Sequence, residues 1–309
     1  MDVLFLTHRD CALHDMGEGH PESPDRLRAI WRALDREEFA ALHRDTPGEA
    51  TREQLERVHP PDYVEAILRI RPPEGEMVPL DGDTLMNAHS ARAALLAAGA
   101  AVQAVDEVCA GRVRRAFCAT RPPGHHAERR RPMGFCLFAN AVVAARHAQA
   151  AHGVERVAIC DFDVHHGNGS QDVVQDDPSI LFLSSHQMPL YPGTGAAEET
   201  GCGNVVNAPL RPGADGAAFR AAWENTLLPA LRAFAPGLVV ISAGFDAHAR
   251  DPLAQLRLTE ADFAWVTEAL CAAADDGCGG RVVSLLEGGY DLHALAASAA
   301  AHVRALLRA

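Results

Sequence analysis

The sequence lacks several features that would assign a class at once. It has no Cys-x-x-Cys pair, no internal repeat, no low-complexity segment and no apolar run long enough to cross a membrane. Its eight cysteines are scattered, several inside apolar runs, which is typical of reduced thiols and argues against a disulfide framework. The amino terminus has no basic leader, and its apolar stretch is too short for a signal peptide. We therefore expect a cytoplasmic protein that does not act on membranes.

Positive charge is also scarce. The chain has 28 Lys+Arg against 41 Asp+Glu, a formal net charge of −13 at pH 7. Nucleic-acid surfaces depend on basic phosphate contacts, so this balance argues against a nucleic-acid partner. A basic substrate suits an acidic protein, although acidic charge is also an ordinary means of solubility. The sequence leaves the oligomeric state open.

Short apolar runs alternate with alanine- and leucine-rich stretches of helical length. The runs that predict strands are 3–7, 114–120, 156–162, 180–185, 238–243 and 281–286. The stretches that predict helices are 24–35, 90–110, 138–152, 217–234, 260–275 and 292–308, with Thr259 and Asp291 as N-caps. This alternation predicts an α/β fold, a doubly wound and mainly parallel sheet flanked by helices, in a single domain over residues 1–309.

Two long irregular stretches interrupt the pattern. The segment 10–24 is polar and rich in His, Glu and Pro, and 71–83 is a second extended connection. Long loops in compact domains tend to be functional. We predict that both border a ligand pocket.

The most informative segment is DFDVHHGNG at 161–169, directly after an apolar run. Residues two apart on an extended chain point the same way, so Asp161, Asp163 and His165 are expected to converge on one face. Oxygen and nitrogen donors without cysteine suit a catalytic zinc, and the same ligands accept Fe²⁺. A single Asp or His at a strand end is more often a cap or a hydrogen-bonded core residue, but several buried together are costly unless paired or bound to a cation.

Three further polar segments follow apolar runs: RPPGHHA at 121–127, SAGFD at 242–246 and LEGGY at 286–290. In open parallel sheets ligands bind outside the carboxyl ends of the strands, so these segments should meet in one pocket. That placement would bring together His125, His126, Asp163, His165, Asp246 and Tyr290, with Asp163, His165 and Asp246 holding the metal and leaving a position open for water. His125 and His126 suit proton transfer, and Tyr290 suits donation to an oxyanion. Taken alone, the two histidines are more often surface loop residues, and Tyr290 is about as often a packed aromatic.

As a set, these segments resemble the zinc-dependent histone deacetylase family of the arginase/deacetylase fold. The motifs that match, in the family's order, are RPPGHHA at 121–127, GFCLFAN at 134–140, DFDVHHGNG at 161–169, YPGTG at 191–195, SAGFDAH at 242–248 and LEGGY at 286–290. The resemblance covers essentially the whole chain. LEGGY, Asn168 and the segment His20 to Pro24 resemble class II members.

The resemblance implies a role for each matching position. Asp163, His165 and Asp246 would hold zinc, His126 would act as general base and then acid, and Tyr290 would stabilise the transition state. His125 would be the electrostatic partner of His126, with Asp161 bonded to His125 and Asn168 to His126. The resemblance further implies a structural potassium ion at Asp161, Asp163, His165, Ser184 and Ser185, with much of the coordination from backbone carbonyls.

The resemblance also implies a channel for an acylated lysine. Phe135 and Tyr191 match its aromatic walls, although the second wall is commonly Phe. Asp83 falls where the family places a rim aspartate, and Gly134 and His20 are further candidates for substrate binding. Leu253 stands where polyamine-specialised members place a glutamate, which favours acyl-lysine over acetylated polyamines.

The resemblance thus implies a zinc-dependent amidohydrolase that removes acetyl or other acyl groups from the ε-amino group of lysine. Three other functions stay open from the sequence: an acetylpolyamine or other small-molecule amidohydrolase, a non-catalytic acyl-lysine binder, and an arginase-like dimanganese hydrolase. The last fits less well because a second metal needs additional carboxylates.

Overall fold

The computed structural model describes residues 3–309 and is built around one eight-stranded parallel sheet. The strands lie in the order β2-β1-β5-β10-β9-β6-β7-β8, and every neighbouring pair is parallel. Their bounds are β1 Val3–Leu6, β2 His43–Asp45, β5 Arg115–Cys118, β6 Val157–Asp161, β7 Ile180–Gln187, β8 Val205–Leu210, β9 Leu238–Ala243 and β10 Val282–Leu286. A two-stranded antiparallel ribbon, β3 Val78–Pro79 with β4 Leu85–Met86, lies outside this sheet. All six predicted strands are confirmed, and the predicted α/β fold with them.

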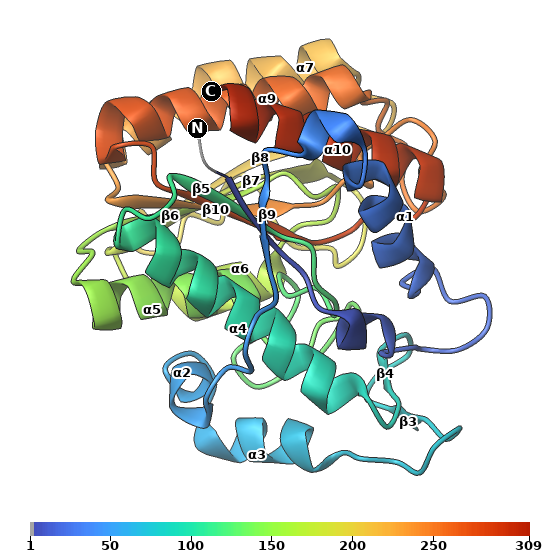
Figure 1. Cartoon of the computed structure of the whole chain (residues 1–309). Coiled ribbons are helices and arrows are strands. Elements are labelled where there is room, and N and C mark those ends of the chain that lie inside the picture. Colours follow the sequence, from blue (N-terminus) through green and yellow to red (C-terminus); the bar gives the residue numbers. More distant parts are fainter. Residues whose placement is uncertain (1–2) are drawn as a thin grey trace.

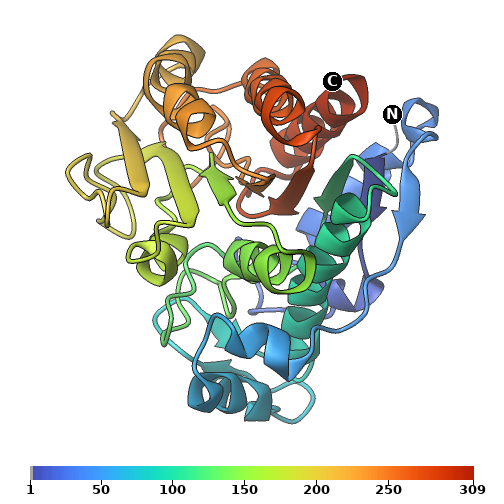
Figure 2. The same cartoon turned by 90° about the vertical axis from the view of Figure 1, so that its left-hand side faces the viewer.

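Helices cover both faces of the sheet (Figure 1), and the view turned by 90° shows the same layers (Figure 2). One layer holds α1 Asp25–Leu34, α7 Gly216–Ala222, α8 Leu228–Phe234, α9 Glu260–Cys278 and α10 Leu292–Arg308. The other holds α2 Arg52–Glu56, α3 Pro61–Arg69, α4 Ser90–Cys109, α5 Asn140–His152 and α6 Asn168–Val174. A π-helical turn, Trp223–Leu227, joins α7 to α8. The six predicted helical stretches are confirmed, and both predicted N-caps form: Thr259 makes a capping box with Asp262, and Asp291 accepts from the backbone N–H of Ala294.

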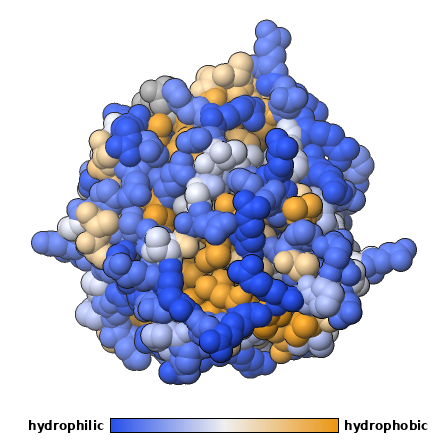
Figure 3. All heavy atoms as spheres, turned by 60° about the horizontal axis from the view of Figure 1, so that its bottom comes forward, coloured by the Kyte–Doolittle hydropathy of each residue, from blue (hydrophilic) through white to orange (hydrophobic). Residues whose placement is uncertain are grey.

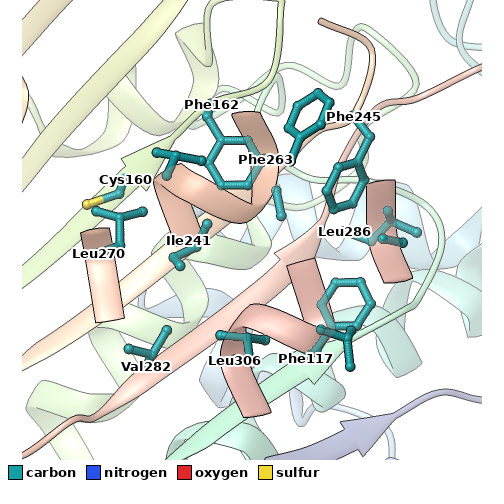
Figure 4. Packing of buried hydrophobic residues seen from close by; sticks show 14 of the residues in the cluster. Phe117, Cys160, Phe162, Ile241, Phe245, Phe263, Leu270, Val282, Leu286 and Leu306 are labelled. Atoms are coloured by element: carbon teal, nitrogen blue, oxygen red, sulfur yellow. The ribbon is translucent and has the colours of Figure 1, made fainter. Parts of the chain in front are cut away.

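Two apolar cores result from the alternation of side chains along buried strands. In β9, Val239 and Ile241 belong to the core under α9 and α10, whereas Leu238 and Val240 belong to the core over α4 and α5. Successive strand residues point to opposite faces, so a strand buried on both sides is apolar throughout. Figure 4 shows part of the first core, where Phe162, Phe245 and Phe263 pack together.

The face shown in Figure 3 is largely hydrophilic and has a recessed apolar patch bordered by hydrophilic side chains. Among residues 3–309, no helix is long and apolar enough to cross a membrane.

The strand order places the four polar motifs side by side. The motifs follow β5, β10, β9 and β6, which are consecutive neighbours in the sheet. Because all four strands are parallel, their carboxyl ends meet at one edge. That edge holds the site described next.

Candidate active site

Two carboxylates and one imidazole converge at this edge. His165 Nδ1 lies 3.1 Å from Asp163 Oδ1 and 3.1 Å from Asp246 Oδ2, and all three side chains are buried. Although burial opposes the charged form, hydrogen bonds with these two carboxylates raise the pKa of His165 to about 10. A cation is thus favoured between the carboxylates. Donors of this type and number match a three-ligand catalytic zinc site.

Glycine makes room for this group. A Cβ on Gly288 would lie 2.0 Å from Asp246 Oδ2, too close for any other residue without a shift. The backbone N–H of Gly288 also donates to Asp163 Oδ2 at 2.8 Å. The LEGGY turn therefore packs directly against the two carboxylates and orients them.

The predicted reason for this convergence is wrong in part. Strand β6 ends at Asp161, so Asp163 and His165 do not continue an extended chain. Instead, Asp161 Oδ1 accepts from the N–H of Asp163 at 3.0 Å, and Asp163 Oδ1 accepts from the N–H of His165 at 2.9 Å. These side-chain to backbone bonds shape the turn, and Asp161 faces His125 rather than joining the other two donors.

A second His and Asp group lies at Asp106, His147 and His152, on α4 and α5. Both imidazole Nε2 atoms lie 2.7–2.8 Å from Asp106 Oδ1. Donor atoms around a tetrahedral zinc with bonds of about 2.0–2.1 Å lie roughly 3.3 Å apart. The shorter spacing is that of ordinary hydrogen bonds. We therefore interpret this group as a link between two helices, which leaves Asp163, His165 and Asp246 as the candidate metal ligands.

The tandem histidines stand beside the candidate metal ligands, and their pKa values are shifted in opposite directions. His125 Nδ1 contacts Asp161 Oδ2 at 2.9 Å, and its Nε2 lies 3.8 Å from Asp163 Oδ1. Burial lowers its affinity for a proton, but these carboxylates hold the pKa of His125 well above its ordinary value. Burial, followed by the charges of His125 and His165, holds the pKa of His126 well below its ordinary value. Opposite shifts in adjacent groups are typical of an acid–base pair with divided roles.

Asn168 fixes which nitrogen of His126 is free. The amide nitrogen of Asn168 donates to Glu128 Oε1 at 2.8 Å, so its oxygen faces His126 Nδ1, also at 2.8 Å. An amide oxygen only accepts, so Nδ1 must carry the proton. The lone pair is then on Nε2, where a base is needed.

Tyr290 enters from the end of β10. Its backbone N–H donates to Asp251 Oδ2 at 2.7 Å, and the guanidinium of Arg26 lies 5.0 Å from its ring centroid. Burial, and next the charge of Asp246, keep the pKa of Tyr290 well above its ordinary value. The raised pKa favours the protonated phenol, which is a hydrogen-bond donor.

A cavity of about 250 Å³ leads to these groups. Its lining is mainly apolar and aromatic: Pro21, Asp83, His126, Gly134, Phe135, His165, Leu190, Tyr191, Leu253 and Tyr290. The ring of Tyr191 stands edge-on to His126 at 5.1 Å, and that of Phe135 edge-on to Tyr290 at 6.0 Å. The cavity thus has two aromatic walls and the tandem histidine at its base. One residue from each predicted rim loop, Pro21 and Asp83, borders it; Pro21 and Leu190 were not among the predicted site residues.

His20 is not among the residues that line the cavity. It lies behind Phe135, edge-on at 4.8 Å, and its Nε2 lies 3.0 Å from the carbonyl oxygen of Asp83. Its Nδ1 accepts from the N–H of Glu22 at 3.1 Å, so Nε2 carries the proton and donates to Asp83. Thr84 Oγ1 accepts from the N–H of Phe135 at 3.0 Å. His20 therefore supports the wall and the rim rather than facing the cavity.

A buried ion cluster behind the site was missed by the sequence reasoning. Glu22 accepts from the guanidinium of Arg121 with both carboxylate oxygens and from Arg26 Nη1 at 2.9 Å. Arg26 also donates to the carbonyl oxygens of Gly289 and Glu287. This cluster joins the 20–24 segment, the tandem-histidine loop and the LEGGY turn. Glu22 and Arg121 both lie in motifs that the sequence analysis singled out, but sequence spacing alone does not show that they form an ion pair.

The predicted potassium residues lie close together in the sheet. Asp161 is the register partner of Ser184 on β7. The hydroxyl groups of Ser184 and Ser185 contact His186 Nδ1 at 2.9 Å and Trp223 Nε1 at 3.0 Å. The potassium site stays a prediction.

The fold and the site together define a hydrolase that acts on amide bonds. The family model described as the histone deacetylase domain matches residues 20–306. The chain belongs to the histone deacetylase family, which is generally metal-dependent.

Two relatives and one solved structure illustrate the similarity. The chain is 39% identical to "Histone deacetylase 14, chloroplastic" of Arabidopsis thaliana over 99% of this chain and 77% of that protein. It is 41% identical to "Histone deacetylase-like amidohydrolase" of Pseudomonas aeruginosa over 88% of this chain and 73% of that protein. It superposes on the crystal structure of the HDA15 HD domain with a TM-score of 0.93 and 39% identity, covering 99% of this chain and 88% of that one.

Proposed function

We propose that the chain is a zinc-dependent deacylase that removes acetyl or related acyl groups from the ε-amino group of lysine. The main support is the arrangement of the cavity. Its aromatic walls suit the aliphatic stem of an acyl-lysine, and its base holds His126 and Tyr290 beside Asp163, His165 and Asp246. Iron(II) would suit the same ligands.

The chain's own residues account for the proton transfers. A zinc ion at Asp163, His165 and Asp246 would polarise the amide carbonyl and lower the pKa of a water molecule. His126, neutral and with Nε2 free, takes the proton of the attacking water. Tyr290 donates a hydrogen bond to the oxyanion of the tetrahedral intermediate. His126 then protonates the leaving nitrogen, which frees the amine and the carboxylate.

The choice of substrate depends on the rim. Leu253 is apolar and lines the cavity, so this position offers no charge to a second ammonium group of a polyamine. Acyl-lysine is therefore the favoured substrate, and an acetylated polyamine is the second candidate because Asp83 adds negative charge at the same rim. A non-catalytic binder is the least favoured, since every position needed for the chemistry is filled.

Other parts of the proposal follow the family resemblance. We propose that residues 1–309 form one deacetylase domain, that potassium binds near Asp161 and Ser184, and that the protein works in the cytoplasm. Its oligomeric state stays open.

The test is a parallel assay of the zinc-loaded protein on acetyl-lysine peptides, longer acyl-lysine peptides and acetylated polyamines. The chain contains no lysine, so its own side chains give no acyl-lysine background. Tyr290→Phe is the control, expected to keep the metal and lose turnover by about 10²–10³. A preference for polyamines would move the enzyme to small-molecule metabolism, absence of turnover would favour the binder, and full activity of Tyr290→Phe would contradict the oxyanion role.

A further inference from the structure

Glu287, the acidic residue of the LEGGY turn, is fully buried beside the tandem histidines. Its Oε2 accepts from the backbone N–H of Gly124 at 2.7 Å and of His125 at 3.1 Å. Its other carboxylate oxygen, Oε1, is buried and has no hydrogen-bond partner within residues 3–309. One oxygen therefore binds two successive amides, although a buried acidic group usually satisfies both of its oxygens.

The opposite side of the same peptide segment is held as well. The carbonyl oxygen of His125 accepts from the N–H groups of Gly169 and Ser170, at 3.0 and 3.1 Å. His125 is thus fixed between β10 and the first turn of α6. Two prolines precede Gly124, so few other backbone amides are available to anchor this loop.

Glu287 is itself held firmly. Its N–H donates to the carbonyl oxygen of Ala243 at 3.0 Å, and its carbonyl oxygen accepts from Arg26. The next residue, Gly288, donates to Asp163. The acceptor is therefore anchored to the same strands that position Asp163 and Asp246.

We propose that Glu287 is a positioning residue, whose single carboxylate oxygen holds the backbone of the tandem histidines so that their imidazoles meet Asp161 and Asn168. This inference rests on the proposed function, because the histidines need such alignment for proton transfer. Displacement of a catalytic group by about 1 Å is enough to cost on the order of 10²-fold in rate. The role needs an acceptor at this point and not a negative charge.

Two variants separate the acceptor from the charge. Glu287→Gln keeps an oxygen for both amides, whereas Glu287→Met is similar in length and offers none. We expect Glu287→Met to lower kcat on an acyl-lysine peptide by at least tenfold, with KM within about twofold and the metal retained. Glu287→Gln should keep kcat within about threefold of the wild type, although its buried NH₂ group reduces thermal stability.

Hydrogen exchange gives a readout that does not depend on turnover. In Glu287→Met the amides of residues 124–127 should exchange faster, and in Glu287→Gln they should exchange as in the wild type. Ser284→Ala is the control, since Ser284 is buried on β10, three residues before Glu287, and bonds His302 instead of the histidine loop. It should lose stability without a change in kcat or in exchange at 124–127.

Three results would overturn the positioning role: unchanged kcat in Glu287→Met, unchanged exchange in Glu287→Met, or a loss in Glu287→Gln as large as in Glu287→Met. If Glu287→Met does not fold, Glu287→Asp, which retracts the carboxylate by one methylene, is expected to show the same loss of kcat and protection. Absence of turnover in the wild type would refute the proposed function, and the exchange experiment would still decide whether Glu287 holds the loop.

Discussion

At the scale of single residues, the basicity of His126 depends on its neutral hydrogen-bond partner, Asn168. Asn168 stabilises a charged imidazole less than a carboxylate would, and burial already lowers the pKa of His126. Asn168→Asp should raise that pKa. Because a general base must be unprotonated, the acidic limb of the kcat/KM profile should move to higher pH.

The measurement is a pH–rate profile of both proteins on one acyl-lysine peptide. Asp172→Asn is the control, because Asp172 lies on the same helix and accepts from the backbone N–H of Arg129, outside the cavity lining. An acidic limb that stays in place in Asn168→Asp would show that His126 is not the base.

Gly134 is required for two separate reasons. Its φ of +55° is in the left-handed region, and a Cβ there would lie 2.4 Å from Cδ2 of His126. Gly153 has a similar φ of +64° with no atom within 4 Å of the added Cβ. We expect Gly153→Ala to cost about 1–2 kcal/mol in the free energy of unfolding, with activity unchanged.

Gly134→Ala should have at least the same stability cost and should also lose kcat by tenfold or more, because the added methyl displaces His126. Thermal unfolding and steady-state kinetics on the two variants test this. Equal activity of the two variants would mean that the contact between Gly134 and His126 does not position the base.

At the level of elements, the sequence predicted the central strands because they are buried on both faces. An unbroken apolar run clearly indicates a strand, whereas the strands at the edges of the sheet have no such run. Strand β2, His43–Asp45, has three exposed residues, and β8 contains Pro209. The short helices α2, α3 and α6 were missed because five to nine residues give too few turns for a clear period.

The candidate metal ligands and the tandem histidines could be predicted because each follows a buried strand. Their pairing was not, because it depends on turns beyond the strand ends. The turn after Asp161 uses side-chain bonds to the backbone, and Phe135 adopts a left-handed φ of 69° that sequence patterns do not indicate for Phe.

His20 connects its own loop with the loops that hold Asp83 and Phe135. Substitution of His20 should therefore weaken substrate binding and leave the chemical step unchanged. His20→Ala removes the donor to the Asp83 carbonyl and the ring behind Phe135. We expect KM for an acyl-lysine peptide to rise by about three- to tenfold with kcat nearly unchanged, since the groups at the cavity base stay in place.

His20→Gln, which keeps a side-chain N–H donor, should recover part of the affinity, and His152→Ala on α5 should leave both constants unchanged. A fall in kcat with constant KM in His20→Ala would assign His20 to the chemistry instead of the rim.

At the scale of the whole molecule, the buried Glu22 cluster should make the free energy of unfolding fall at acidic pH. Burial opposes its charge, but Arg121 and Arg26 lower the pKa of Glu22 to about 2 from its ordinary 4.5. A depressed folded-state pKa contributes stability above the unfolded value, and that stability is lost as pH falls from about 4.5 to 2. The contribution is about 3 kcal/mol.

Urea unfolding of the wild type and Glu22→Gln at pH 7 and pH 3 measures this contribution. Glu22→Gln should be several kcal/mol less stable at pH 7, because two guanidinium groups lose their counterion, and the difference should shrink at pH 3. Glu38→Gln breaks an exposed pair with Arg304 and should change stability by less than about 1 kcal/mol. A difference that is constant with pH would contradict the charged state of Glu22.

Metal binding should release protons from the protein and should increase the stability of the fold. In the metal-free protein the pKa of His165 is about 10, because Asp163 and Asp246 outweigh the effect of burial. His165 is therefore protonated below that pH and must release its proton to act as a ligand. At pH 8.5 the buried carboxyls of Asp251 and Glu287, with pKa values of about 7, are already ionised. Zinc binding at this pH should release at least one proton, that of His165, and a second one where zinc lowers the pKa of a water molecule.

Calorimetric titration of zinc in two buffers with different ionisation enthalpies gives the number of protons released. The same titration on His165→Gln should show weaker binding and one fewer released proton. Zinc at one hundred times its dissociation constant should stabilise the wild type by about 2.7 kcal/mol and raise its Tm, an effect that a chelator reverses. Binding without proton release would mean that the zinc ligands lie elsewhere, and His147→Gln, at the hydrogen-bonded group on α4 and α5, would then be the variant that loses the metal.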